Sequence, residues 1–275
     1  MNHPTKSILL ASVLTLSAGL ASAQSFPDFQ VTEGPVAGAL PNTFTADKIT
    51  GNYDEVISFS DSAFQVSLLW NAGQFVANNG GTPVASQLGA ATPNQYGMYA
   101  LFQGNGTVQP ANGSGTTFNF SPGGTLRIFI DPNADSRFGA PGSGAGAFSV
   151  TNGSDDYLIA TGMPTSGQGT LDPTLSTCGA SNGINCGNFG ASSSLNLTTA
   201  GSQYFTSPNP FYNISFQSGQ LNNFAPTGTQ RINGSLDVIF SGGGGGNQVP
   251  EPGTIALLGL GFLGLGLMRR KARQA

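Results

Sequence analysis

Histidine is almost absent from this sequence of 275 residues, and the single one is His3. Ser-His-Asp and Cys-His mechanisms need an imidazole to carry the proton. Once the N-terminal residues that include His3 are removed, the chain has no imidazole and cannot use these mechanisms. Lysine is equally rare between residues 24 and 248, where Lys48 stands alone. Because Asp47 precedes it, a surface ion pair is a simpler interpretation than a catalytic amine.

Charged side chains are scarce as well, at 8% of all residues. Between residues 24 and 248, four basic side chains stand against twelve acidic ones, which gives a net charge of −8. A surface of this sign repels nucleic acid and anionic lipid, so we expect no nucleic-acid partner. Recurrent Phe and Ile argue against intrinsic disorder, which goes with high charge density and low hydrophobicity.

The sequence contains only two cysteines, Cys178 and Cys186. They lie in a Gly/Asn/Ser-rich segment without a nearby histidine or a second cysteine pair, which disfavours a zinc site. In an exported chain such a pair predicts a disulfide that closes a short loop.

Helical periodicity is missing between the two terminal segments. Apolar residues instead recur with period two, which predicts strands buried on one face. Asp61 and Ser62 interrupt two such strands and predict a hairpin. We therefore expect an all-β fold: a loop-rich, antiparallel β-sandwich-like domain over residues 24–241. The alternating segments are 56–60, 64–69, 96–102, 117–120, 126–130, 157–160, 195–197, 214–216 and 236–240.

Glycine and proline mark the expected breaks in this domain. Three prolines predict an irregular segment over residues 26–41, and Gly/Ser-rich composition predicts surface loops over 139–147 and 161–183. Asn-Gly dipeptides predict turns, because positive φ costs little there. They begin at Asn105, Asn112, Asn152, Asn182 and Asn233.

A short acidic motif directly follows the predicted strand 126–130. Oxygen ligands stand at alternate positions, Asp131, Asn133 and Asp135, as at the start of a calcium-binding loop. The sixth position holds Ser136 instead of glycine, and the twelfth holds Gly142 instead of an acid. A plain Asp-Pro-Asn turn is therefore the alternative. No cofactor other than this calcium ion is predicted.

Paired carboxylates are the remaining route to catalysis, since a glycosidase needs two acids about 5 to 10 Å apart. Asp54-Glu55 and Asp155-Asp156 are each adjacent in sequence, so on a strand the two members of a pair would face opposite sides. We therefore interpret both pairs as turn or solvated loop positions. We expect the protein to have no enzyme activity.

The N-terminal segment 1–23 has the pattern of a secretory signal peptide. Lys6 supplies the positive charge, residues 8–20 are apolar, and Ala21-Ser22-Ala23 precedes Gln24. This pattern predicts cleavage after Ala23 and export through the secretion translocon.

The C-terminal segment has three parts in a fixed order. Five glycines open a predicted linker over residues 242–248, and an apolar run of about 254–268 is long enough for a short membrane-spanning helix. Between them stand Val249, Pro250, Glu251 and Pro252. After the run comes a basic cluster that the positive-inside rule places in the cytoplasm: Arg269, Arg270, Lys271 and Arg273.

This order of Val-Pro-Glu-Pro, apolar span and basic cluster in residues 249–275 resembles the PEP-CTERM sorting signal of Gram-negative bacteria. The resemblance implies recognition by an exosortase, a membrane-embedded cysteine protease that removes the tail near Pro-Glu-Pro. The protein would then occupy the inner membrane transiently before it reaches the cell surface or the extracellular matrix.

Six short segments of the body carry a second resemblance: residues 44–49, 53–59, 130–133, 204–205, 210–212 and 233–238. These segments resemble the flocculation-associated PEP-CTERM proteins. The resemblance implies a noncatalytic matrix protein that acts with extracellular polysaccharide in cell aggregation, and it offers no catalytic residues. A carbohydrate- or calcium-binding surface module is the alternative, and an exopolymer hydrolase is a further one.

Exposed amides, hydroxyls and aromatic side chains can contact sugars. Trp70, Tyr96, Tyr99 and Tyr204 are candidates for that role, with burial in the core as the alternative.

Overall fold

The computed structural model describes residues 26–89, 94–110, 115–178 and 183–241. The predicted signal peptide, the predicted glycine linker and the predicted membrane-spanning helix with its basic cluster all lie outside these ranges. Within them, no helix is long and apolar enough to span a membrane.

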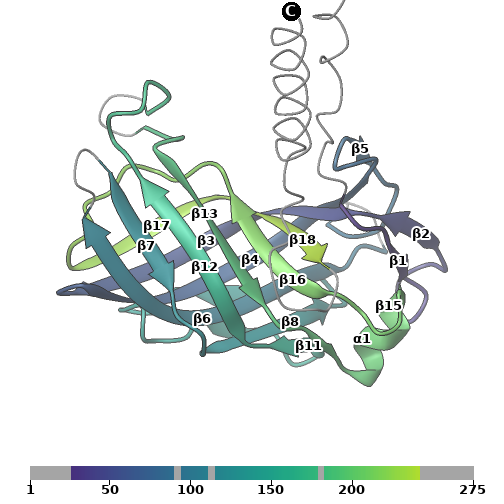
Figure 1. Ribbon diagram of the computed structural model, residues 1–275. Coiled ribbons are helices and arrows are strands. Elements are labelled where there is room, and N and C mark those ends of the chain that lie inside the picture. The colour runs from purple at the N-terminus through teal and green to yellow at the C-terminus, as the bar shows by residue number, and fades with distance from the viewer. Residues whose placement is uncertain (1–25, 90–93, 111–114, 179–182, 242–275) are drawn as a thin grey trace, which may run out of the picture. The chain divides into compact units, whose positions relative to one another are not determined.

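Most strands belong to one antiparallel sheet whose pairings return to their starting point (Figure 1). The ring closes where β18 pairs with β3, through Val238 opposite Ile49 and Ile239 opposite Lys48. The prediction of an antiparallel all-β fold is confirmed. In ring order the strands are β3 (Lys48–Ser60), β4 (Ala63–Ala77), β6 (Gly97–Pro110), β7 (Thr116–Phe120), β12 (Pro164–Leu171), β13 (Gly187–Ser193), β16 (Asn213–Ser218) and β18 (Asp237–Ser241).

The remaining elements are attached to this ring. The first half of β6 also pairs with β8 (Thr125–Asp131), which continues to β11 (Tyr157–Gly162) and β14 (Asn196–Leu197). β17 (Thr229–Ser235) pairs with β3, and β5 (Thr82–Pro83) pairs with β4. Within the described ranges, two small sheets and one helix complete the fold: β15 (Phe205–Ser207) with β1 (Phe29–Thr32) and β2 (Thr43–Ala46), β9 (Arg137–Gly139) with β10 (Ser149–Thr151), and α1 (Thr199–Tyr204).

Aromatic rings fill the space between the two faces of the ring. In Figure 1, β12, β13 and β16 cross in front of β3 and β4. Trp70 of β4 meets Phe216 of β16 at a centroid distance of 6.1 Å, and Tyr53 of β3 meets Phe189 of β13 at 5.4 Å. Both pairs are edge-to-face, the arrangement that aromatic quadrupoles prefer. The two faces thus pack like a sandwich whose edges are joined.

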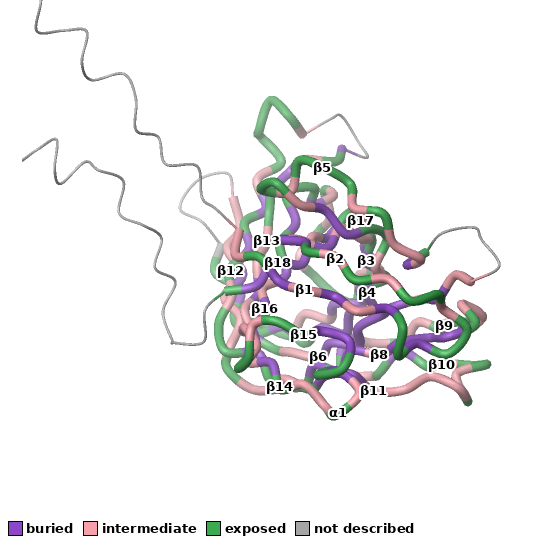
Figure 2. Tube along the Cα trace, turned by 90° about the vertical axis from the view of Figure 1, so that its right-hand side faces the viewer, coloured by how far each residue is buried: buried purple, intermediate pink, exposed green. Residues whose placement is uncertain are grey.

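A second, smaller core covers the outer side of β3, β4, β6 and β8. Phe148 is buried there against Val56, Leu69, Tyr99 and Leu101. Strand β4 is therefore buried on both faces through its middle, in contrast to the exposed β5 (Figure 2). The predicted loop over residues 139–147 leads into Phe148 and holds this cover in place, since the Gly144 amide donates to Ser58 Oγ at 2.9 Å.

Two predicted irregular segments contain strands. Strand β1 lies inside residues 26–41, and β12 lies inside 161–183. Proline marks the ends of β1 without entering it. In β12 the glycines allow close packing: a Cβ at Gly167 would lie 2.6 Å from the Gly190 carbonyl oxygen. Both predictions were wrong. In β1 the buried Phe29 and Val31 do alternate with polar residues, but the pattern is only four residues long and lies between prolines. Strand β12 shows no alternating apolar pattern.

The Asn-Gly dipeptides divide between turns and strands. Asn152 adopts a φ of 61° in a turn, as predicted. Asn105-Gly106 lies within β6 and Asn233-Gly234 within β17, so these two predictions were wrong. Gly106 is required in its strand, since a Cβ there would lie 2.6 Å from the Phe64 ring and closer still to the Asn119 carbonyl. Asn112 and Asn182 lie outside the described residues.

Glu55 of β3 is a carboxyl group in an aromatic environment. Its side chain is 5% exposed and lies among Phe102, Phe120, Phe189 and Phe216, and it makes no hydrogen bond with the described residues. Burial, followed by the nearby Asp54 carboxylate, raises the pKa of Glu55 from 4.5 to about 8. The folded state therefore holds a proton that the unfolded chain releases near pH 4.5.

We expect the wild-type free energy of unfolding to fall as pH rises from about 5 to 8, with a slope of up to about 1.4 kcal/mol per pH unit. The sign follows because the folded protein binds more protons than the unfolded chain in this window. Glu55→Gln should flatten this dependence and give the more stable protein at pH 8. Urea denaturation at several pH values measures the slope. Asp28→Asn, at an exposed position, is the control that should leave it unchanged.

Candidate functional site

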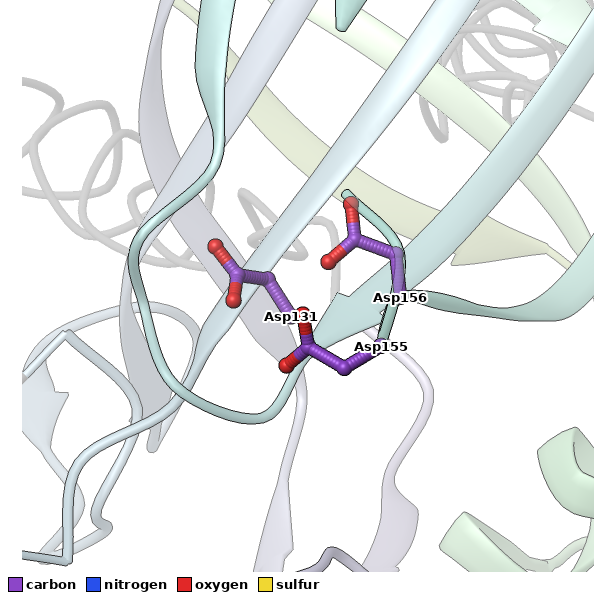
Figure 3. Close-up of side chains that lie close together, drawn as sticks. All are labelled: Asp131, Asp155 and Asp156. Carbon is purple, nitrogen blue, oxygen red and sulfur yellow. The ribbon is translucent and has the colours of Figure 1, made fainter. Parts of the chain in front are cut away.

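Three carboxylates from two neighbouring strands converge at one edge of the large sheet. Asp131 ends β8, and Asp155 and Asp156 directly precede β11. Because Tyr157 pairs with Ile130, the start of β11 lies beside the end of β8. One oxygen from each of the three carboxylates lies within 4.8 Å of the others (Figure 3).

Hydrogen bonds fix two of these carboxylates. Asp131 is buried, and its oxygens accept from the amides of Asp135 at 3.3 Å and Ser136 at 2.9 Å. Asp156 Oδ2 accepts from Tyr99 Oη at 2.6 Å and from Ser136 Oγ at 2.7 Å. Burial, then the hydrogen bond to Asp156, raises the pKa of Tyr99, so this phenol stays a donor. Both carboxylates are thus held in place as hydrogen-bond acceptors.

Of the three ligands predicted for the calcium loop, only Asp131 belongs to the carboxylate cluster. Asp131 lies in the cluster, while Asn133 approaches it through an amide, with Nδ2 donating to Asp155 Oδ2 at 2.8 Å. Asp135 is not among the carboxylates that meet there. Its Oδ1 and the Oδ1 of Asp156 are buried without a hydrogen-bond partner within the described ranges. Ala134, at a φ of 52°, turns the chain at the fourth position of the motif, whereas calcium loops have their turn-forming glycine at the sixth.

The chemistry open to this cluster is cation binding. Hard cations such as Ca²⁺ prefer carboxylate and carbonyl oxygens, and here three negative charges lie close together with two unpartnered buried oxygens nearby. Sequence reasoning identified Asp131 and the Asp155-Asp156 pair separately. Only the pairing of β8 with β11 brings them together.

The other charged residues considered as sites, Asp54, Glu55 and Lys48, form no contact with this cluster among the interactions of the described residues. Asp54 forms a bidentate ion pair with the Arg231 guanidinium, whereas Glu55 points into the core. The interpretation of this pair as turn or loop positions was wrong, because both residues lie in β3 and face opposite sides of it. Lys48 Nζ pairs with Asp237 at 2.8 Å rather than with its neighbour Asp47. Asp47 accepts instead from the amides of Asn79 and Gly80.

The cysteines and the candidate aromatic residues have structural roles. Cys178 and Cys186 form a disulfide, with Cα atoms 4.3 Å apart and Cys186 fully buried. Trp70, Tyr96, Tyr99 and Tyr204 are all buried, so the alternative of core packing is the one the structure shows.

Comparison with known proteins adds one observation. The family model described as the PEP-CTERM protein-sorting motif matches residues 248–271. The chain carries a PEP-CTERM sorting signal. It is therefore exported, sorted through a membrane-anchored state and processed by an exosortase. No curated protein and no solved structure matches the chain.

The sorting signal lies outside the described residues. This holds for Val249, Pro250, Glu251 and Pro252 and for the basic cluster of Arg269, Arg270, Lys271 and Arg273. The predicted cleavage residues Ala21, Ala23 and Gln24 lie outside as well.

We expect 5 mM CaCl₂ to raise the melting temperature of the full chain in mild detergent. At an affinity of about 0.5 mM, typical of weak extracellular sites, the gain is about 1.4 kcal/mol, or about 3 to 5 °C for a body of this size. Asp155→Asn should abolish the shift, while Asp61→Asn, at an exposed hairpin turn, should retain it. Scanning calorimetry with CaCl₂ and with EDTA makes the comparison, and an unchanged wild-type midpoint removes the metal hypothesis.

Proposed function

We propose that the protein is a noncatalytic component of an extracellular matrix that acts with secreted polysaccharide in cell aggregation. The observation that carries this proposal is the sorting signal joined to a body with an uncharged sheet face. The signal delivers the chain to the outside of the cell, and the body supplies the surface that meets the polymer.

The uncharged face consists of four strands that are neighbours in the ring. β7, β12, β13 and β16 contain no Asp, Glu, Lys or Arg. Their outward side chains are amides and hydroxyls that bond to one another across strands, such as Gln168 to Asn119 at 3.1 Å and Thr170 to Asn188 at 3.4 Å. Such a face offers many weak hydrogen bonds to a hydroxylated polymer, and a repeating polymer turns weak contacts into firm attachment.

The bonding of the acidic groups supports a noncatalytic role. A glycosidase needs one carboxylic acid that donates a proton. Asp131 and Asp156 are instead held as hydrogen-bond acceptors, and Asp54 is neutralised by Arg231. Glu55 is the one protonated acid described above, and it lies in the core away from solvent.

Calcium binding is a second candidate function, favoured by the convergence of Asp131, Asp155 and Asp156. A divalent cation bound there would stabilise the β8–β11 edge and would suit an exported protein, since extracellular calcium is abundant. This function is compatible with the matrix role and does not replace it.

Gene deletion with complementation tests the matrix role. We expect cells without the gene to disperse while they make the same amount of polysaccharide. The full chain should restore flocs, and a chain with Pro250, Glu251 and Pro252 changed to alanine should not, because sorting needs the signal.

The Glu251→Asp chain is the matched control. It keeps the negative charge of the motif but shortens the side chain, so it tests whether the exosortase recognises the charge alone or the full glutamate side chain. Cells that aggregate normally after deletion would contradict the proposal. A drop in polysaccharide would contradict it as well, since the protein would then act in synthesis.

A further inference from the structure

An open groove of about 620 Å³ lies where β3, β4 and the ring-closing strand β18 meet. This volume is within the range of about 300 to 1,000 Å³ that ligand sites occupy. Unlike most such sites it is lined mainly by hydroxyl, amide and backbone groups.

A β-bulge forms the floor of the groove. Thr50 pairs with Gln74 and Gly51 with Ala72, so Gly73 stands without an opposite residue. Bulges redirect side chains and often border binding sites. Gly51 cannot carry a side chain, since a Cβ there would lie 2.5 Å from the indole nitrogen of Trp70. The two glycines Gly51 and Gly73 line the groove together with Thr50, Asn52 and Gln74.

One wall is the segment that follows β5, in which alternate residues face the groove. Val84, Ser86 and Leu88 line it. Gln87 faces the other way and is held by the buried Glu33. The Glu33 carboxylate accepts hydrogen bonds from the backbone amide of Gln87 at 2.7 Å and from its side-chain amide at 3.0 Å. These bonds hold the wall in place before any ligand arrives.

The opposite wall is also held by a buried residue, Leu236, between two residues that face the groove. Leu236 is fully buried, its amide donates to the Gly51 carbonyl at 2.9 Å, and its own carbonyl accepts from Trp70 Nε1 at 2.9 Å. The flanking residues Ser235 and Asp237 both line the groove. Buried anchors thus present polar neighbours on both sides, which is the preorganisation that a binding site needs.

The groove offers hydrogen-bonding groups that are not already used. The side chains of Asn52, Gln74, Ser86 and Ser235 make no hydrogen bond with the described residues. The charge of Asp237 is neutralised by Lys48, so the groove is close to electrically neutral, while the net charge of the body disfavours anions.

We propose that this groove binds a short segment of a neutral polysaccharide. This inference rests on the proposed matrix function and names the place and the chemical class of the contact. The amides and hydroxyls that line the groove can pair with sugar hydroxyls. A peptide would need apolar pockets, which Val84 and the buried Leu88 do not supply.

The test measures affinity for a panel of neutral oligosaccharides of six hexoses, β-1,3-, β-1,4- and α-1,6-linked, by calorimetric titration of the full chain in mild detergent. Oligogalacturonate serves as the anionic probe. We expect Asn52→Ala with Gln74→Ala to lower affinity for the preferred neutral probe at least tenfold. Gln65→Ala is the matched control, since Gln65 is an exposed glutamine on the same strand β4. Ser235→Trp, at an exposed position, should block the groove without removing any of its anchors.

The outcomes separate this inference from the matrix role. If the double variant and Ser235→Trp bind like the wild type, the groove is not the site, while flocs that still depend on the gene leave the matrix role standing. Binding of oligogalacturonate in preference to every neutral probe overturns the assignment of ligand class. A wild-type chain that binds no member of the panel overturns the inference as well, and the complementation assay then decides the matrix role independently.

Discussion

The pairing of β18 with β3 is the constraint on which the rest of the body depends. It joins the last described strand to one near the beginning and so turns a sheet with two edges into a ring. The same pairing brings Asp237 to Lys48 and Leu236 to Gly51. Ring closure, the ion pair and the groove therefore all depend on this one strand pairing. The closed ring encloses the aromatic core between its two faces.

Alternating apolar residues predicted most of the strands, because period-two burial is a local property of the chain. The 61–62 hairpin and the strands around Ile128, Ile214 and Val238 could all be found this way. Strand β12 could not, since its Gly, Ser and Thr residues are placed by contacts with β7 and β13 that no local pattern records. Hydrogen-bonded pairing, unlike burial, has no signature in a single segment.

The acidic cluster shows the same limit at the level of a site. Local spacing favoured Asp131, Asn133 and Asp135, yet the carboxylates that meet are Asp131, Asp155 and Asp156. The register of two strands decides which acids become neighbours, and a register cannot be read from either strand alone. The sorting signal is the opposite case. It is a linear motif defined by the order of its parts along the chain, so the sequence alone was sufficient to identify it.

Ring closure also imposes an order of events during folding. Strand β18 ends at Ser241, just before the glycine run, so it is the last part of the body to be made. Until it is available, β3 and β16 each lack a neighbour and the ring stays open. The sorting signal follows this strand in the sequence, so the body already has all its strands when the exosortase meets its substrate.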